Sequence, residues 1–163
     1  MFLKINFEET KSLYHEYTKS RGGSKEVARR LRQLSMLMEL IAQLAVKEMN
    51  AKNSNIPSEE LWMYVECFYY LAFRTRNIIR NLPGLNSFDC PGIRNVRNKL
   101  LEHPEKSGAV LRQSFSWGRA SGPVIKARRM EKEIRIFPDV GLYENYLEFQ
   151  ENLNVLLKKA TLD

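Results

Sequence analysis

Two long stretches of the chain carry apolar residues at alternating intervals of four and three positions, and this pattern constrains the fold more than any other feature. In the first stretch the apolar positions are Val27, Leu31, Leu34, Met38, Ile41 and Ala45. In the second, where Thr75 fills one slot, they are Leu61, Val65, Phe68, Ala72, Ile79 and Leu82. Because this spacing puts the apolar side chains on one helix face, we expect long helices at 24–50 and 58–82.

The residues that flank these stretches indicate where the helices begin and end. Ser24 follows a pair of glycines and is a candidate N-cap for the first helix. Pro57 stands at the entry of the second helix, where a proline is favoured because its missing N–H has no partner to lose. Pro83 and Gly84 end that helix. The two helices are therefore separate elements joined by a short polar linker.

Three shorter segments with helical spacing complete the α-helical part of the chain, at 6–20, 93–103 and 142–160. Two long antiparallel helices joined by a short linker are the frame of an α-helical bundle. With 163 residues, of which 44% are hydrophobic, the chain has the size and composition of one globular domain. We predict a mainly α fold, an antiparallel bundle of four or five helices, in a single domain over residues 1–163.

The segment at 106–137 departs from the helical pattern. Between Lys106 and Met130 it holds six basic residues and no acidic one. VLRQSFSW and PVIKA flank the glycine-containing GRASG, which predicts a small β-hairpin near 110–137, and EIRIF adds a third extended piece. One interpretation is a flap in which Trp117 stacks on a base and the backbone phosphates meet Arg119, Lys126, Arg128 and Arg129. The other is an excursion that caps the bundle with its aromatic side chains buried.

The overall composition excludes several classes of protein. No apolar run is long enough to cross a bilayer, and the first residues lack the apolar core of a secretory signal, so we expect a cytoplasmic protein. Cys67 and Cys90 are too few and too far apart for a disulfide framework or a zinc site, and only two histidines are present. We therefore expect no metal and no cofactor. The net charge of +7 favours an anionic partner.

The segment IRNVRNKLLEHP, residues 93–104, carries the chemistry that this chain suggests. Arg97 and Asn98 lie within the expected short helix, and His103 lies at its end, directly before Pro104. A guanidinium offers a rigid fork of donors for phosphate oxygens, and an imidazole exchanges protons near neutral pH. Together they suit metal-independent cleavage of RNA, in which the 2′-OH is the nucleophile. Asn98 either orients the histidine or binds the phosphate.

This arrangement resembles the HEPN superfamily, in which long antiparallel helices precede an arginine, four to six residues and a histidine. Arg97-x5-His103 fits that spacing, and the polar Asn98 directly after the arginine also matches. The resemblance covers residues 24–104 and the last helix, whereas the β segment departs from the family pattern. It implies a metal-independent ribonuclease of a toxin–antitoxin, defence or RNA-processing system, working as a dimer that brings two motifs into one cleft. Other members have lost catalysis and serve as binding modules.

The function expected from these observations is RNA cleavage, with Arg97 binding the phosphate and His103 acting as general acid or base. The positive floor of the cleft is extended by Arg76, Arg80 and Arg94. Its partners are RNA, a second copy of the chain and an antitoxin or other protein. The alternative is a non-catalytic helical module that binds a nucleic acid, a nucleotide or a protein. A third hypothesis is a purely structural dimer. A metal-dependent pyrophosphohydrolase is disfavoured, because no second acidic helix accompanies Glu59, Glu60 and Glu66.

Overall fold

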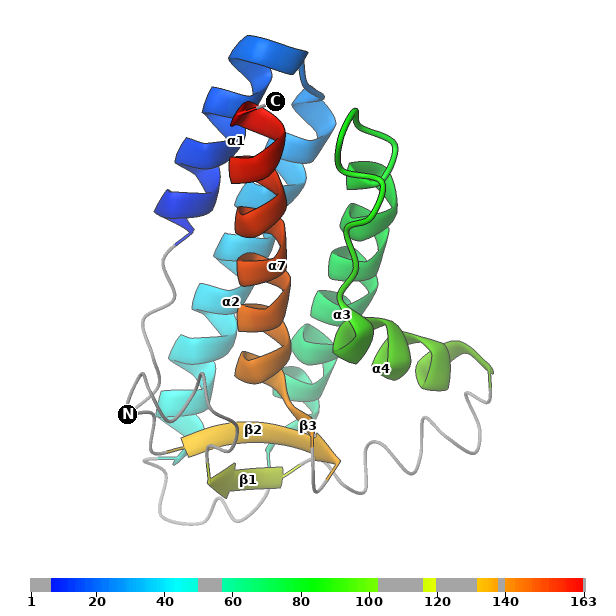
Figure 1. Cartoon of the computed structure of the whole chain (residues 1–163). Helices are drawn as coiled ribbons and strands as arrows, with labels where there is room; N and C mark the ends of the chain where they lie inside the picture. Colours follow the sequence, from blue (N-terminus) through cyan, green and yellow to red (C-terminus); the bar gives the residue numbers. More distant parts are fainter. Residues whose placement is uncertain (1–6, 50–56, 103–115, 120–131, 138–139, 163) are drawn as a thin grey trace.

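The computed structural model describes residues 7–49, 57–102, 116–119, 132–137 and 140–162. These residues form the five helices α1 (Glu8–Arg21), α2 (Lys25–Met49), α3 (Glu59–Ile79), α4 (Pro91–Glu102) and α7 (Leu142–Leu162). The fold is mainly α and the helices form a bundle, which confirms that part of the prediction (Figure 1). Within the described ranges, no helix combines the length and apolar character that crossing a membrane requires.

The long helices lie side by side, and α4 runs across them. α2 packs against α3, and α1 packs against α7. α2 and α3 run in opposite directions. After α3 the chain turns back along that helix, and α4 begins beside the lower half of α3 and points away from it at a steep angle (Figure 1). α4 contacts both α3 and α7, so it closes one side of the bundle where these two helices meet. The first part of the Arg97 segment therefore lies on a helix that is anchored to two others.

The alternating four-three positions of α2 and α3 form the core of the bundle, as the sequence predicts. Val27, Leu31 and Leu34 of α2 and Leu61, Val65 and Phe68 of α3 are fully buried. Thr75 is also buried, and its hydroxyl donates a hydrogen bond to the backbone oxygen of Leu71 at 2.7 Å. Because this bond satisfies the hydroxyl within its own helix, a polar residue is buried in the core with only a small loss of folding free energy.

The end of α2 is tied to the start of α3 by one carboxylate. The backbone N–H and the hydroxyl of Ser58 donate hydrogen bonds to Glu48, at 2.6 Å and 2.8 Å. The Ser58 hydroxyl oxygen also accepts a hydrogen bond from the N–H of Leu61 at 3.1 Å, which caps the first turn of α3. Glu48 and Ser58 therefore fix the two long helices relative to each other at this end.

A small antiparallel sheet of order β1-β2-β3 contacts the start of α7. β1 (Ser116–Arg119) pairs with β2 (Lys132–Phe137), with Trp117 opposite Ile134, and β2 pairs with β3 (Val140–Gly141). EIRIF, expected as a third extended piece, is thus the direct partner of β1. The predicted partner PVIKA and most of GRASG lie outside the described residues.

Two tyrosines in the core differ in whether their hydroxyl groups are satisfied. The Tyr69 hydroxyl accepts a hydrogen bond from the side-chain amide of Asn145 at 2.7 Å. The Tyr146 ring packs edge-on against Phe7 with 5.2 Å between ring centroids, and burial raises its pKa far above the usual range. Within the part of the chain that the structure describes, the Tyr146 hydroxyl has no hydrogen-bond partner. A buried hydroxyl without a partner opposes folding.

We predict opposite effects for the same substitution at these two positions. Tyr146→Phe removes an unsatisfied buried hydroxyl, so the free energy of unfolding should stay the same or rise by up to about 1 kcal/mol. Tyr69→Phe leaves the amide of Asn145 without its acceptor and should lower the free energy of unfolding by about 1–2 kcal/mol. Urea denaturation followed by circular dichroism measures both. Equal losses in the two variants would contradict the assignment.

Candidate nucleic-acid interface

Arg97 lies in the middle of α4 and is held against an aromatic ring of α3. Its guanidinium carbon is 4.3 Å from the centroid of the Phe73 ring, well within the range of a cation–π contact. Its Nη1 donates a hydrogen bond to the Oδ1 of Asn98 at 3.2 Å. Among the described residues, no carboxylate forms an ion pair with Arg97. The guanidinium is therefore oriented, while most of its five N–H groups are left for another acceptor.

Tyr70 lies beside this pair on α3. Burial raises the pKa of Tyr70, the charge of Glu66 adds to the effect, and the charge of Arg97 opposes it. The Tyr70 hydroxyl therefore stays protonated at neutral pH, so it is able to donate a hydrogen bond. Arg97, Phe73 and Tyr70 together present one guanidinium and two half-buried aromatic rings on the α3–α4 surface.

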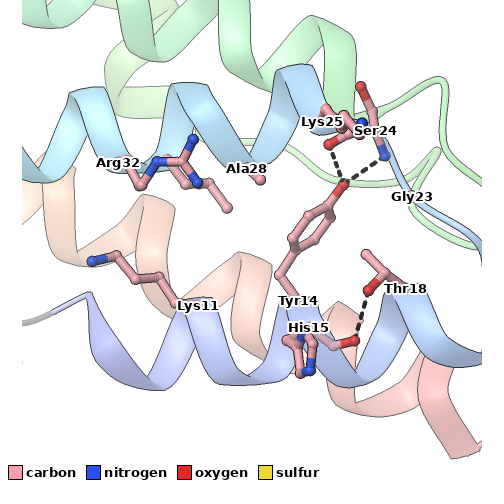
Figure 2. Close-up of a pocket in the computed structure, with 10 residues that line it drawn as sticks. Lys11, Tyr14, His15, Thr18, Gly23, Ser24, Lys25, Ala28 and Arg32 are labelled. Carbon is pink, nitrogen blue, oxygen red and sulfur yellow. Dashed lines mark hydrogen bonds between the residues drawn. The ribbon is translucent and has the colours of Figure 1, made fainter.

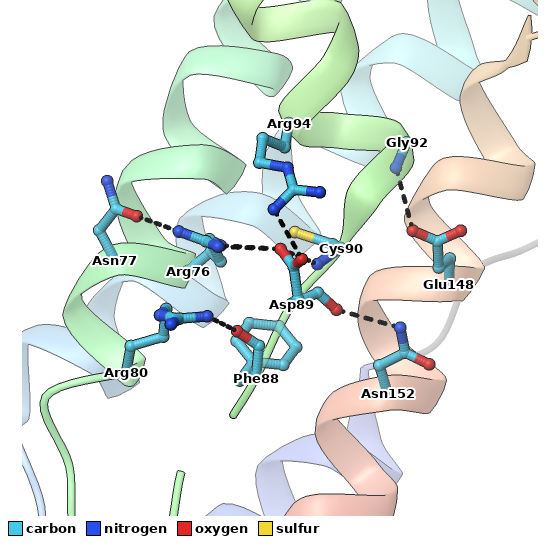
Figure 3. Close-up of polar contacts among 10 residues, drawn as sticks. All are labelled: Arg76, Asn77, Arg80, Phe88, Asp89, Cys90, Gly92, Arg94, Glu148 and Asn152. Atoms are coloured by element: carbon cyan, nitrogen blue, oxygen red, sulfur yellow. Dashed lines mark hydrogen bonds and ion pairs between the residues drawn. The ribbon is translucent and has the colours of Figure 1, made fainter. Parts of the chain in front are cut away.

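Asp89, in the loop before α4, links the two helices beneath this surface. Its Oδ1 accepts hydrogen bonds from Arg76 Nε at 3.1 Å and from the backbone N–H of Cys90 at 2.9 Å. Its Oδ2 forms an ion pair with Arg94 Nη1 at 2.9 Å (Figure 3). Arg76 belongs to α3 and Arg94 to α4, so a single carboxylate joins both helices through charge-assisted hydrogen bonds.

α7 holds the start of α4 from the other side. The side-chain amide of Asn152 donates to the backbone oxygen of Asp89 at 3.0 Å, and Glu148 accepts from the N–H of Gly92 at 3.2 Å (Figure 3). A Cβ at Gly92 would lie 2.1 Å from the Oδ1 of Asn145, so only glycine allows this approach. These contacts set the direction of α4, and the direction of α4 sets the position of Arg97.

The residues predicted for the site fall into three groups. Arg97 and Asn98 are adjacent and hydrogen-bonded. Arg76 and Arg94 bind Asp89, and Arg80 donates to the backbone oxygen of Phe88 at 2.9 Å, so phosphate would have to compete for these three. Trp117 and Arg119 lie in β1, where only the backbone is described. The expected residues that lie outside the described part of the chain are His103, Lys126, Arg128 and Arg129.

Sequence reasoning missed Phe73, Tyr70 and Asp89 as members of the site. Tyr70 and Phe73 lie off the four-three positions that form the buried face of α3, and both are half-buried. Asp89 is the only acidic residue between Glu66 and Glu102, a span that contains five arginines. A lone carboxylate among so many cations is a recognisable signal for a shared ion-pair partner.

Cys90, which lies next to Asp89, carries a buried thiol. Burial and the charge of Asp89 raise the pKa of Cys90 to about 12, so its thiol stays protonated and is a poor nucleophile. In the described ranges, no cluster of three or more His, Cys, Asp or Glu side chains is arranged to hold a metal ion. Of the described groups, the Arg97 guanidinium is the one oriented to bind an anion.

Comparisons with family models, with curated proteins and with solved structures found no match for this chain. What the site can do therefore follows from its own residues. An oriented guanidinium is able to bind an anionic oxygen group through two parallel hydrogen bonds.

The pKa of Asp89 gives a test of the junction that positions Arg97. Partial burial acts to raise the pKa of this carboxyl, but the hydrogen bonds from Arg76 and Cys90 and the charges of Arg76 and Arg94 outweigh it and lower the pKa below 3.8. A carboxyl whose pKa is lowered in the folded state stabilises the fold above the pKa of the unfolded chain. That contribution is lost as the pH falls through the lower native pKa.

We predict that Asp89→Asn lowers the free energy of unfolding at pH 7 by about 1–2 kcal/mol, with the more exposed Arg94 contributing less than Arg76. The difference between variant and wild type should shrink as the pH is lowered below 3.8. Urea denaturation across a pH series measures it. Glu16→Gln, which breaks the exposed pair with Lys19, is the control and should leave stability unchanged. A pH-independent loss for Asp89→Asn would contradict the junction.

Proposed function

We propose that this protein binds single-stranded RNA at the α3–α4 surface and cleaves it without a metal, as a ribonuclease of HEPN type. One observation about Arg97 supports this proposal most strongly. Arg97 is held over Phe73 with no carboxylate partner in the described ranges, whereas its neighbours Arg76 and Arg94 share Asp89. The arginine named by the Arg97-x5-His103 spacing is thus the one whose donors are left for a phosphate.

In the proposed reaction Arg97 binds the two non-bridging oxygens of the scissile phosphate. Phe73 covers one face of the guanidinium, which leaves the N–H groups at its edge unused by the ring, and one of them donates to Asn98. His103 either removes the proton of the 2′-OH while water protonates the departing 5′-oxygen, or protonates that oxygen while water accepts the proton of the 2′-OH. The 2′-oxygen forms a new bond to phosphorus, the bond from phosphorus to the 5′-oxygen breaks, and a 2′,3′-cyclic phosphate is left. Arg97 offsets the charge that develops on the phosphate.

A second copy of the chain belongs to this proposal. α4 ends at Glu102, directly before His103. Positions 97 and 103 are about 120° apart on a regular helix, so one segment does not stack its arginine on its own histidine. In a dimer, the two copies of this segment would face each other. One copy then supplies the arginine of a cleft, and its partner supplies the histidine. An antitoxin or another protein would then act by covering that cleft.

The basic segment at 106–137, with its proposed hairpin, is the second RNA contact in this scheme. Its backbone at β1 places Trp117 and Arg119 two residues apart, on the same side of the strand. We propose that Trp117 stacks on a base and that phosphates are bound by Arg119, Lys126, Arg128 and Arg129. The RNA strand would then contact cationic and aromatic side chains in turn along this surface.

A second candidate function is RNA binding without cleavage. It is favoured by the fact that Arg97, Phe73 and Tyr70 together provide charge and stacking surfaces that require no histidine. Such a module predicts affinity that falls steeply with salt and no turnover. The two functions share the α3–α4 surface and differ only in the role of His103.

We expect purified protein to cleave labelled single-stranded RNA in EDTA, and Arg97→Gln and His103→Ala to lower the rate by about 100-fold or more, since each removes a group that acts on the transition state. Gel analysis of cleavage rates measures this. Arg74→Gln is the matched control, because Arg74 is exposed on α3 and loses the same charge.

The outcomes separate the two functions. RNA binding that Arg97→Gln weakens, with no cleavage by the wild type, would identify the non-catalytic module. Cleavage that persists in His103→Ala would remove the catalytic assignment. Binding that is lost equally in Arg74→Gln and Arg97→Gln would show that only bulk charge matters. Circular dichroism and urea denaturation confirm that each variant is folded.

A further inference from the structure

A separate cavity of about 380 Å³ lies between α1 and the first turns of α2. The turn that joins these helices is at the opposite end of the bundle from the sheet, whereas α4 leaves α3 in the other half of the molecule (Figure 1). None of the residues that line this cavity belongs to α3 or α4. The cavity is therefore distinct from the Arg97 surface.

Three cationic side chains line this cavity: Lys11 from α1, and Lys25 and Arg32 from α2. Lys25 and Arg32 are exposed, and neither forms an ion pair with another described residue. Lys11 shares only the Nζ–Oε1 contact of 3.3 Å with Glu8, whose side chain is 70% exposed. An exposed ion pair of this kind is weak and yields readily to a stronger anion. The cavity thus carries an excess of positive charge.

The nearest acidic residue of α2 does not neutralise that charge. Glu26 binds Arg29, and its Oε1 accepts from the Nε of Arg30 at 2.8 Å. These hydrogen bonds lower the pKa of Glu26 and commit its carboxylate to two other cations. Lys25 and Arg32 therefore remain available towards the cavity.

The wall of the cavity is rigid. The Tyr14 hydroxyl accepts a hydrogen bond from the N–H of Ser24 and donates one to its backbone oxygen, both at 2.9 Å (Figure 2). A Cβ at Gly23 would lie 2.3 Å from the Cγ2 of Thr18, so the turn approaches α1 as closely as glycine permits. The hydrogen bonds of Tyr14 and this close approach fix the turn against α1, so this wall needs little ordering when a ligand binds.

The cationic groups lie towards two ends of the cavity. In Figure 2 Lys11 and Arg32 occupy one end, Lys25 lies with Ser24 at the other, and the Tyr14 side chain lies near the Ser24 end. Ala28 and Leu31 add apolar lining. A ligand that matches this layout has an anionic group at each end and an organic part between them. The volume suits a small organic ligand and exceeds what one inorganic phosphate fills.

We propose that this cavity binds a small organic bisphosphate of nucleotide size. The guanidinium of Arg32, with Lys11, holds one phosphoryl group, and Lys25 holds the other near Ser24. We choose phosphate as the anion because its oxygens match the hydrogen-bond donors of an arginine. The negative charge of a phosphate is also large enough to pair with more than one cation. This site does not depend on RNA cleavage at Arg97.

Isothermal titration calorimetry with adenosine 3′,5′-bisphosphate, adenosine 5′-monophosphate and adenosine tests the proposal. The bisphosphate should bind about tenfold more tightly than the monophosphate, because only it reaches both ends, and adenosine should bind least. Arg32→Gln and Lys25→Gln should each weaken bisphosphate binding about tenfold. Lys47→Gln removes the same charge from an exposed position elsewhere on α2 and should leave binding unchanged.

Several results would overturn the proposal. These are an absence of bisphosphate binding, equal binding of adenosine and the bisphosphate, or a loss in Lys47→Gln as large as that in Arg32→Gln. Arg97→Gln separates the two sites: it should leave bisphosphate affinity unchanged, and loss of binding in that variant alone would place the ligand on α4. The cavity variants change exposed side chains and are expected to fold, which circular dichroism checks.

Discussion

The carboxylate of Asp89 decides how the rest of the α3–α4 surface is arranged. It binds Arg76 of α3 and Arg94 of α4 at the same time, and its backbone oxygen is held by Asn152 of α7. A partly buried carboxylate is stable only when cations and N–H groups surround it, and these contacts supply both. Three helices are therefore joined at one point, and α4 leaves that point in a fixed direction.

That junction also divides the arginines into two kinds. Arg76 and Arg94 share the single negative charge of Asp89, so an added anion must compete with that carboxylate for them. Arg97 lies one turn further along α4 than Arg94 and rests on the Phe73 ring, which the Arg76 guanidinium also approaches, at 5.5 Å from the centroid. An aromatic ring orients a guanidinium without using its hydrogen-bond donors. The fold thus orients Arg97 without giving it a carboxylate partner among the described residues, while the positive charge around it is spread over several arginines.

Much of the bundle was predictable because each helix is specified by the residues of its own segment. The four-three spacing around Leu31 and Val65 specifies which face of each helix is buried, whichever helix packs against it. Both residues are fully buried. The place of α4 was not predictable, because it depends on Gly92 meeting Asn145 of α7, 53 positions away along the chain. The pairing of β1 with EIRIF was missed for a similar reason: a strand's own alternation does not say which of two later segments it joins.

The candidate site divides in the same way. The sequence proposed Arg97 and Asn98 from their spacing and type, whereas the contact of Phe73 with Arg97 appears only when α4 is placed across α3. The most direct test of the central claim is ¹⁵N NMR of the arginine Nε–H groups during titration with a single-stranded RNA oligonucleotide made resistant to cleavage by 2′-deoxy substitution. The Arg97 resonance should shift strongly and early, while that of Arg76, held by Asp89, stays in place. A shift at Arg76 with none at Arg97 would contradict the account.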